Sequence, residues 1–162
     1  MSTIDAPLPS APRIGGRKPH VLIVRAPYYV AISDGLRDGA IRILRDAGAT
    51  WEVLDVAGAL ELAAAVRMAL HSPRAFDAYV ALGCVVRGDT DHYQFVCDQA
   101  MAGMTQVVMA HAVCLGNGLL TVNDASQAVA RSGPDGHNKG AEAAVAALLQ
   151  VRAMRWLSET PA

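Results

Sequence analysis

Apolar residues along the chain form short continuous runs that alternate with longer stretches of helical spacing. The runs at residues 21–24, 51–56, 78–84 and 113–122 are typical of strands buried on both faces of a parallel sheet. Stretches with apolar residues three or four positions apart separate these runs, and two more follow the last one. This order predicts right-handed crossovers and a mainly parallel sheet between two layers of helices.

Polar residues and glycines predict where several of these elements begin and end. Ser33 is suited to cap the first helix and Gly48 to end it, while Asp124 and Asn138 are suited to cap the last two helices. The glycines in residues 116–118 indicate a bulge or a close approach of two backbones. The predicted common side of the final helix consists of Ala141, Val145, Leu148, Leu149, Arg152 and Trp156.

The first 19 residues differ in composition from the rest of the chain. They contain four of the eight prolines, which excludes a helix or a central strand. This segment is either an arm that adds an edge strand to a neighbouring subunit or a frayed terminus. We therefore divide the 162 residues into an N-terminal arm (1–19), one domain (20–158) and a C-terminal tail (159–162).

Charge and composition exclude several classes of function. A net charge of −1 provides no basic excess to attract nucleic acid or a membrane surface, and no apolar run approaches the roughly 20 residues of a membrane span. Cys84, Cys97 and Cys114 form no CxxC pair and are interpreted as reduced core thiols. We expect a soluble, cytoplasmic protein that binds no metal. Its small apolar side chains favour contact with a partner subunit.

Polar residues lie where the predicted strands end. If the sheet is parallel, the loops after its four strands open on one edge, so Tyr28, Glu61, residues 87–92 and Asn117 would surround a pocket. Backbone amides at the start of the helix near Thr90 could hold a phosphate. The chain has no GxGxxG or Walker-type loop, so a nucleotide-binding module of flavodoxin type lacks any fingerprint.

Four side chains near this edge have both a chemical and a structural interpretation. His92 could exchange protons near neutral pH, or it could be an ordinary exposed histidine in the first turn of a helix. Arg131 and Lys139 flank a polar turn and suit two cations that approach one anion, but most such residues are solvated surface charges. Glu61 could bind a ligand or only favour the positive end of its helix.

Four sequence motifs, taken together, resemble the lumazine synthase family over about residues 20–156. They are Gly-Ala-Leu-Glu-Leu at 58–62, Ala-Leu-Gly-Cys-Val-Val-Arg-Gly-Asp-Thr-Asp-His-Tyr at 81–93, Gly-Asn-Gly-Leu-Leu-Thr-Val at 116–122 and Asn-Lys-Gly-Ala-Glu-Ala-Ala at 138–144. The resemblance implies a flavodoxin-like three-layer α/β/α sandwich with a four-stranded, mainly parallel sheet. It also implies an N-terminal strand that can extend the sheet of a neighbouring subunit.

The resemblance implies a transferase of riboflavin biosynthesis that needs no cofactor. Such enzymes condense 5-amino-6-(D-ribitylamino)uracil with 3,4-dihydroxy-2-butanone 4-phosphate to 6,7-dimethyl-8-ribityllumazine. His92 would transfer protons during this reaction. The phosphate-binding residues would be Gly88, Asp89, Thr90, Arg131 and Lys139. The residues that bind the uracil and its ribityl chain would be Tyr28, Ala59, Leu60, Glu61, Cys84, Val85, Val86 and Asn117.

Sites in this family lie between subunits, which would put Asn117, Arg131 and Lys139 opposite the other site residues. Members form pentamers, and in some of them twelve pentamers close into a hollow icosahedral shell. The turn at residues 133–137 lacks the extra insertion that would make the chain resemble pentamer-only members. The resemblance therefore allows either a free pentamer or an icosahedral shell.

The chain departs from the family at several positions around the expected site. Members often have proline where Ala57 and Ala63 stand, an Arg-Phe-Asn-like run where Pro27-Tyr28-Tyr29 stands, and an aromatic residue at Asn117. Loss of both prolines frees the backbone near the ribityl chain, and the different aromatic positions alter stacking. These departures motivate an alternative hypothesis, in which the chain is a catalytically weakened shell-forming scaffold or a flavin-binding homologue.

Overall fold

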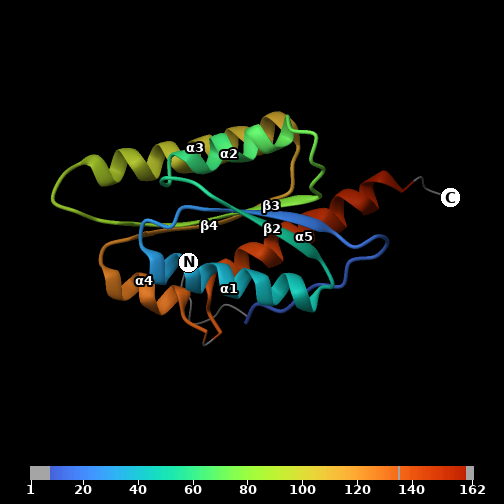
Figure 1. Cartoon of the computed structure of the whole chain (residues 1–162), viewed down its shortest axis with the longest axis horizontal. Coiled ribbons are helices and arrows are strands. Elements are labelled where there is room, and N and C mark those ends of the chain that lie inside the picture. The colour runs from blue at the N-terminus through green and yellow to red at the C-terminus, as the bar shows by residue number, and fades with distance from the viewer. Residues whose placement is uncertain (1–7, 135, 160–162) are drawn as a thin grey trace.

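A four-stranded parallel sheet lies between two layers of helices in the computed structural model, which describes residues 8–134 and 136–159 (Figure 1). The strands, in the spatial order β2-β1-β3-β4, are β1 (His20–Arg25), β2 (Thr50–Asp55), β3 (Ala78–Val86) and β4 (Leu115–Val122). The helices are α1 (Val30–Asp46), α2 (Glu61–Leu70), α3 (His92–His111), α4 (Ala125–Ser132) and α5 (Lys139–Ser158). The predicted flavodoxin-like three-layer sandwich is confirmed.

Alternate residues of the strands face the two helical layers. Val21 and Ile23 of β1 pack toward α1 and α5, whereas Leu22 and Val24 pack toward α2 and α3. Figure 1 shows α1, α4 and α5 on one side of the sheet and α2 and α3 on the other. The strands are therefore buried on both faces, which explains why their sequences are continuously apolar instead of alternating.

Glycines let α5 approach both the sheet and α1 closely. A Cβ atom on Gly116 of β4 would lie 1.9 Å from the carbonyl oxygen of Ala143 in α5. A Cβ atom on Gly140 of α5 would lie equally close, at 1.9 Å, to the carbonyl oxygen of Leu36 in α1. The close approach predicted at residues 116–118 is confirmed, but the bulge is wrong, because β4 pairs with β3 without interruption.

Helix α1 begins earlier than the sequence predicted. Its N-cap is Tyr29, and the carbonyl oxygen of Tyr29 already accepts a bond from the amide of Ser33 (2.9 Å). Ser33 therefore lies inside the first turn, where its hydroxyl donates to the carbonyl of Val30, and the prediction that it caps the helix is wrong. Asp124 and Asn138 do cap α4 and α5, as predicted.

The buried side of α5 differs from the predicted one. The prediction is wrong for three residues that are exposed in the structure, namely Leu149, Arg152 and Trp156. Trp156 is 69% exposed. The buried residues of this helix are Gly140, Ala141, Ala143, Ala144, Ala147, Leu148 and Val151. Mostly small residues face inward because the backbone of α5 lies so close to β4 and α1 that larger side chains do not fit.

The described part of the N-terminal arm, residues 8–19, runs along its own domain and contains no strand. Ala11 and Ile14 pack against the core cluster on the side of the sheet that α1 and α5 cover, and Arg17 forms an ion pair with Asp77. Residues 1–7 of the arm and 160–162 of the predicted tail lie outside the described residues, and the exchange of a strand between subunits stays a prediction.

Within the described chain, no helix combines the length and apolar character needed to cross a membrane.

Candidate functional site

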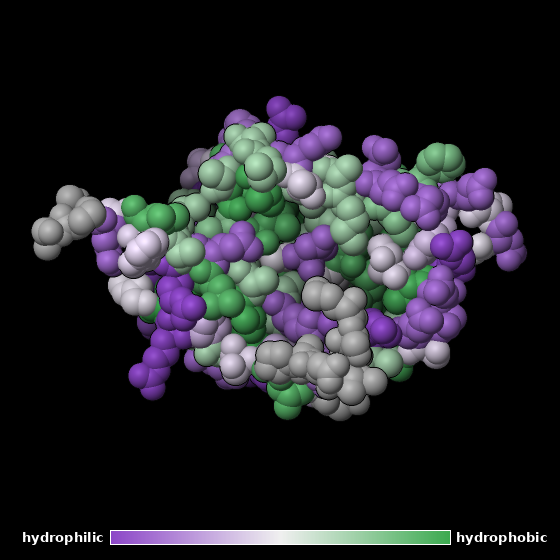
Figure 2. All heavy atoms as spheres, turned by 180° about the vertical axis from the view of Figure 1, so that it is seen from behind, coloured by the Kyte–Doolittle hydropathy of each residue, from purple (hydrophilic) through white to green (hydrophobic). Residues whose placement is uncertain are grey.

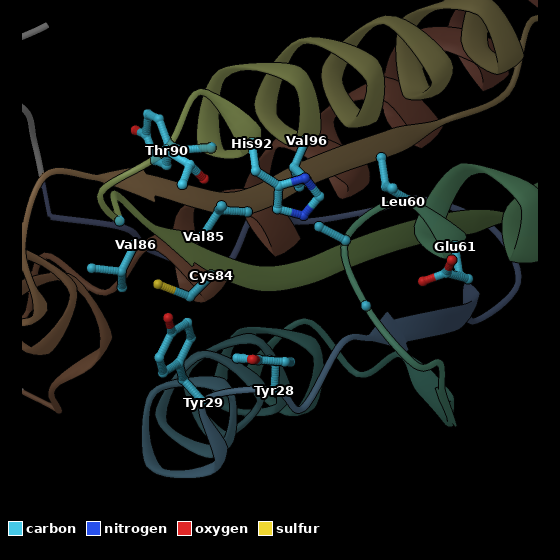
Figure 3. Close-up of a pocket in the computed structure, with 14 residues that line it drawn as sticks. Tyr28, Tyr29, Leu60, Glu61, Cys84, Val85, Val86, Thr90, His92 and Val96 are labelled. Carbon is cyan, nitrogen blue, oxygen red and sulfur yellow. The ribbon is translucent and has the colours of Figure 1, made fainter.

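A pocket of about 330 Å³ lies at the carboxyl ends of the strands, as expected for an open parallel sheet (Figure 3). The loops after β1, β2 and β3 and the first turns of α3 enclose it. Its lining residues are Tyr28, Tyr29, Gly58, Ala59, Leu60, Glu61, Cys84, Val85, Val86, Gly88, Thr90, His92, Tyr93 and Val96. Most of the residues predicted for the site therefore come together in one cavity.

Two tyrosines form the wall that follows β1. Tyr28 and Tyr29 meet edge to face, with their ring centroids 5.1 Å apart, and Figure 3 shows both rings below the end of β3. Tyr28 is 76% exposed, although aromatic rings favour burial. This ring is therefore available to stack on a planar ligand.

The opposite wall is the loop that joins β2 to α2. Two long turn bonds hold it, from the amide of Glu61 to the carbonyl of Gly58 (3.2 Å) and from Leu62 to Ala59 (3.3 Å). Glu61 is the first residue of α2, where the positive end of the helix favours a carboxylate. This wall offers the pocket an acidic hydrogen-bond acceptor beside the apolar side chain of Leu60.

The end of β3 forms the floor of the pocket. Cys84 is 6% exposed, and burial raises the pKa of its thiol to about 11. The thiol is therefore neutral near pH 7, and it offers a weak donor to a ligand instead of a nucleophile. Among the described residues, no group of three or more His, Cys, Asp and Glu is arranged to hold a metal ion.

His92 projects into the pocket from the first turn of α3 (Figure 3). Its ring is exposed, so it can exchange protons with a bound molecule or with water. Beside it, the guanidinium of Arg87 lies 4.6 Å from the ring centroid of Tyr93, whose pKa is raised mainly by burial. The first amides of a helix lack acceptors within the helix, so this end of α3 also suits an anion.

Four residues predicted for the site do not line this pocket. Asp89 is exposed in the loop before α3, and Asn117 on β4 donates to Sδ of Met101 (3.0 Å). Arg131 donates to the carbonyl of a residue in its own helix (3.0 Å), and Lys139 forms an ion pair 2.6 Å long within α5. Among the described residues that line the pocket, none is lysine or arginine.

The sequence prediction missed Tyr29, Gly58, Tyr93 and Val96 as lining residues. Val96 could have been found, because a residue four positions after His92 faces the same side of a helix. Tyr29 and Gly58 each adjoin a predicted residue in an irregular loop. The direction of a side chain in such a loop depends on backbone angles that no simple periodicity predicts.

Known proteins are similar to this chain over most of its length. The family described as 6,7-dimethyl-8-ribityllumazine synthase matches residues 18–155. The enzyme named 6,7-dimethyl-8-ribityllumazine synthase 1 from Rhodopseudomonas palustris is 44% identical over 158 residues, which cover 95% of this chain and 96% of the relative. Relatives named 6,7-dimethyl-8-ribityllumazine synthase are 42% identical in Nitrobacter hamburgensis (95% and 96% covered) and in Bartonella tribocorum (83% and 89% covered).

Proposed function

The chain belongs to the 6,7-dimethyl-8-ribityllumazine synthase family, and on that premise we propose how its pocket carries out the family's reaction. The enzyme is a transferase of riboflavin biosynthesis. It condenses 5-amino-6-(D-ribitylamino)uracil with 3,4-dihydroxy-2-butanone 4-phosphate to 6,7-dimethyl-8-ribityllumazine, and it releases phosphate and water. The observation that carries this conclusion is that residues of the motifs at 58–62 and 81–93 line one cavity.

The two walls and the floor of the pocket bind the uracil substrate in this proposal. Tyr28 stacks on the pyrimidine ring, which its exposure allows. The loop that contains Ala59 and Leu60 holds the ribityl chain, with the carboxylate of Glu61 accepting hydrogen bonds from its hydroxyl groups. Residues 84–86 at the end of β3 meet the polar edge of the pyrimidine.

His92 and the start of α3 act on the phosphate-bearing substrate. When the amine attacks the ketone, a carbinolamine forms, and a proton must reach its oxygen before water leaves. Phosphate elimination then requires loss of a proton from the neighbouring carbon. The exposed imidazole of His92 can serve both steps. Backbone amides around Gly88, Asp89 and Thr90 hold the phosphate at the start of the helix.

A second subunit completes the phosphate site. The pocket wall of one chain has no lysine or arginine among its described lining residues, although a phosphate dianion favours cationic partners. We infer that Arg131 and Lys139 reach the phosphate from a neighbouring chain, and that Asn117 closes the pocket from the same side. Hydrophobic residues that reach the surface in several places on the face drawn in Figure 2 support contact between subunits. In this proposal the assembly is a homopentamer or a 60-subunit shell. The location of the protein in the cytoplasm stays a prediction.

A turnover assay tests the reaction itself. The purified protein is mixed with both substrates, and formation of the fluorescent lumazine is followed over time. An enzyme gives a rate that is proportional to protein concentration and saturates with each substrate. The uncatalysed rate alone would contradict the proposal and would favour the alternative hypothesis of a scaffold or a flavin-binding homologue.

A subunit-mixing experiment tests the shared site. His92→Ala and Arg131→Ala chains, each of low activity alone, are co-expressed in equal amounts and purified together through different tags. If each site uses His92 of one chain and Arg131 of its neighbour, about a quarter of the sites in a randomly mixed ring are intact. If both residues belonged to the same chain's site, every site would keep a defect and the mixture would stay at the level of the parents.

A further inference from the structure

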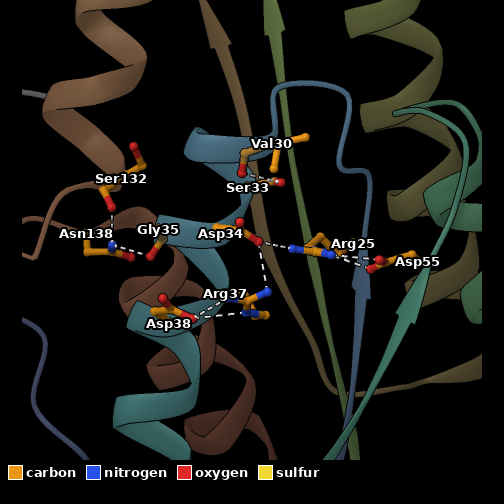
Figure 4. A network of polar contacts seen from close by, with 10 residues as sticks. All are labelled: Arg25, Val30, Ser33, Asp34, Gly35, Arg37, Asp38, Asp55, Ser132 and Asn138. Atoms are coloured by element: carbon orange, nitrogen blue, oxygen red, sulfur yellow. Dashed lines mark hydrogen bonds and ion pairs between the residues drawn. The ribbon is translucent and has the colours of Figure 1, made fainter.

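A nearly buried arginine, Arg25, lies between the carboxylates of Asp34 and Asp55 and binds both (Figure 4). Arg25 is the last residue of β1, and its side chain is only 11% exposed. Nε donates to Oδ1 of Asp55 (2.8 Å) and Nη2 donates to Oδ2 of the same carboxylate (2.6 Å). The third nitrogen, Nη1, donates to Asp34. The guanidinium thus binds two carboxylates at once.

Strand register brings these groups together. Arg25 and Asp55 are direct partners in the parallel pairing of β1 with β2, so their side chains leave the sheet on the same face. Asp34 lies in α1, which covers that face. The bidentate hydrogen bonding to Asp55 requires the planar geometry of a guanidinium, which a lysine ammonium does not have. The hydrogen bond from Arg25 holds the pKa of Asp55 below its usual range.

The three joined segments continue directly into the walls of the pocket. Three residues after Arg25 comes Tyr28, and three residues after Asp55 comes Gly58. Asp34 is in the first turns of the helix that begins just after Tyr29. The Arg25 side chain therefore links the base of the tyrosine wall to the base of the wall that contains Glu61.

The backbone of the second wall is joined to β1 at its base, where the amide of Val56 donates to the carbonyl of Arg25 (2.8 Å). Beyond that point, the turn bonds among the described residues of the loop are the two long ones of 3.2 and 3.3 Å. Ala57 and Gly58 leave many backbone conformations accessible there. An anchor at the base of this loop would offset that freedom.

We propose that Arg25 is a positioning residue that sets the spacing between the two walls and thereby the affinity for the uracil substrate. This inference rests on the proposed function, because it assigns the ring and the ribityl chain to these walls. Arg25 does not line the pocket and is not a catalytic residue. The phosphate end of the site and His92 lie on the β3–α3 side and do not depend on it.

Three variants test this role. Arg25→Ala removes the link and Asp55→Ala removes its partner on β2. Arg37→Ala is the matched control, because Arg37 shares the Asp34 carboxylate (2.8 Å) but, within the described part of the chain, its other hydrogen bonds go to Asp38 and none to Asp55. The Michaelis constants of both substrates, kcat and the dissociation constant of the fluorescent lumazine product are measured for each.

The first two variants should raise the Michaelis constant for the uracil substrate and the product's dissociation constant about tenfold, since small displacements of binding groups have large effects. The Michaelis constant for the phosphate substrate and kcat should change by less than about twofold, as should every constant of the Arg37→Ala enzyme. A general loss of stability would instead lower the active fraction, and so kcat, without selecting one substrate.

Two results would overturn the proposal. One is an unchanged affinity of the Asp55→Ala enzyme for the uracil substrate. This result is decisive because the Asp55 side chain is 48% exposed, so its removal leaves the core intact. The other uses no activity and so stands apart from the proposed function. Amide hydrogen exchange in residues 56–62 should become faster in Arg25→Ala and not in Arg37→Ala, and equal exchange in both would exclude the link.

Discussion

His92 is the histidine among the described residues that line the pocket, and an imidazole can act as a general acid and as a general base. Replacement by alanine should lower kcat by about a hundred- to ten-thousand-fold, the typical contribution of a general acid or base. Steady-state kinetics measures this effect. His111→Ala provides a matched control, because His111 is exposed at the other end of the same helix. A His92→Ala enzyme with the rate of the unmodified protein would disprove the assigned role.

The cysteines allow a second prediction for single residues. Cys84, Cys97 and Cys114 are all free and buried, and burial raises the pKa of each, to about 11 for Cys84. At pH 8 only about one Cys84 thiol in a thousand is ionised, and the thiolate is the reactive form. Iodoacetamide should therefore label none of the three until denaturant is added, as read by mass spectrometry. Rapid labelling of Cys84 in the folded protein would contradict the assigned burial.

Asn138 shows how one residue organises several elements. Its side-chain oxygen Oδ1 caps α5 by accepting from the amide of Ala141 (3.0 Å). Its amide group donates to the carbonyls of Gly35 in α1 and Ser132 at the end of α4 (Figure 4). The same group also donates to the carbonyl of Gly133 (3.0 Å). Asn138 is 2% exposed, and the carbonyl of Ser132 that it binds is buried with it. Asn138 therefore joins α1, α4 and α5.

Replacing Asn138 should destabilise the fold strongly. Asn138→Ala removes a helix cap and leaves buried carbonyls without a donor, which together cost about 2–4 kcal/mol. Urea denaturation followed by circular dichroism measures the free energy of unfolding. Asp124→Ala is the comparison, because it removes an exposed cap from α4 alone and should cost less. Equal losses for the two variants would show that the additional bonds of Asn138 contribute nothing.

Helix α5 illustrates what periodicity predicts and what it misses. The helical spacing and the cap correctly predicted that an element runs from residue 139 to about 157. The prediction of its buried side was wrong, because small residues are spread around the helix among larger ones. Which of them face inward depends on where Gly140 meets α1 and Ala143 meets β4. These contacts connect residues that are distant in the sequence.

At the scale of the whole molecule, the exposed apolar side chains predict an assembly. They include Tyr28, Phe95, Met109, Trp156 and Leu157, each more than 60% exposed in the single chain. A surface of this kind favours burial against further copies of the chain. Sedimentation or light scattering should therefore give a mass of about five times 17.0 kDa, or that of a closed shell. A particle with the mass of one chain would rule out the shared site.

The sequence by itself determined the class of fold, the order of the elements and most residues of the pocket. It could do so because buried parallel strands and amphipathic helices each have a local apolar pattern, and because parallel strands bring their following loops to one edge. Tyr28, Glu61 and His92 were therefore predicted to lie together, and all three line the cavity.

Only the tertiary structure decided where α1 begins, which side of α5 is buried and how the pocket walls are joined. Ser33 has the residue type of a cap, yet the chain had already turned into a helix at Val30. Arg25 and Asp34 are nine positions apart, and Asp55 lies thirty positions from Arg25 on another strand. The physical reason is that caps, buried faces and ion pairs depend on partners in space, whereas periodicity reports only on neighbours along the chain.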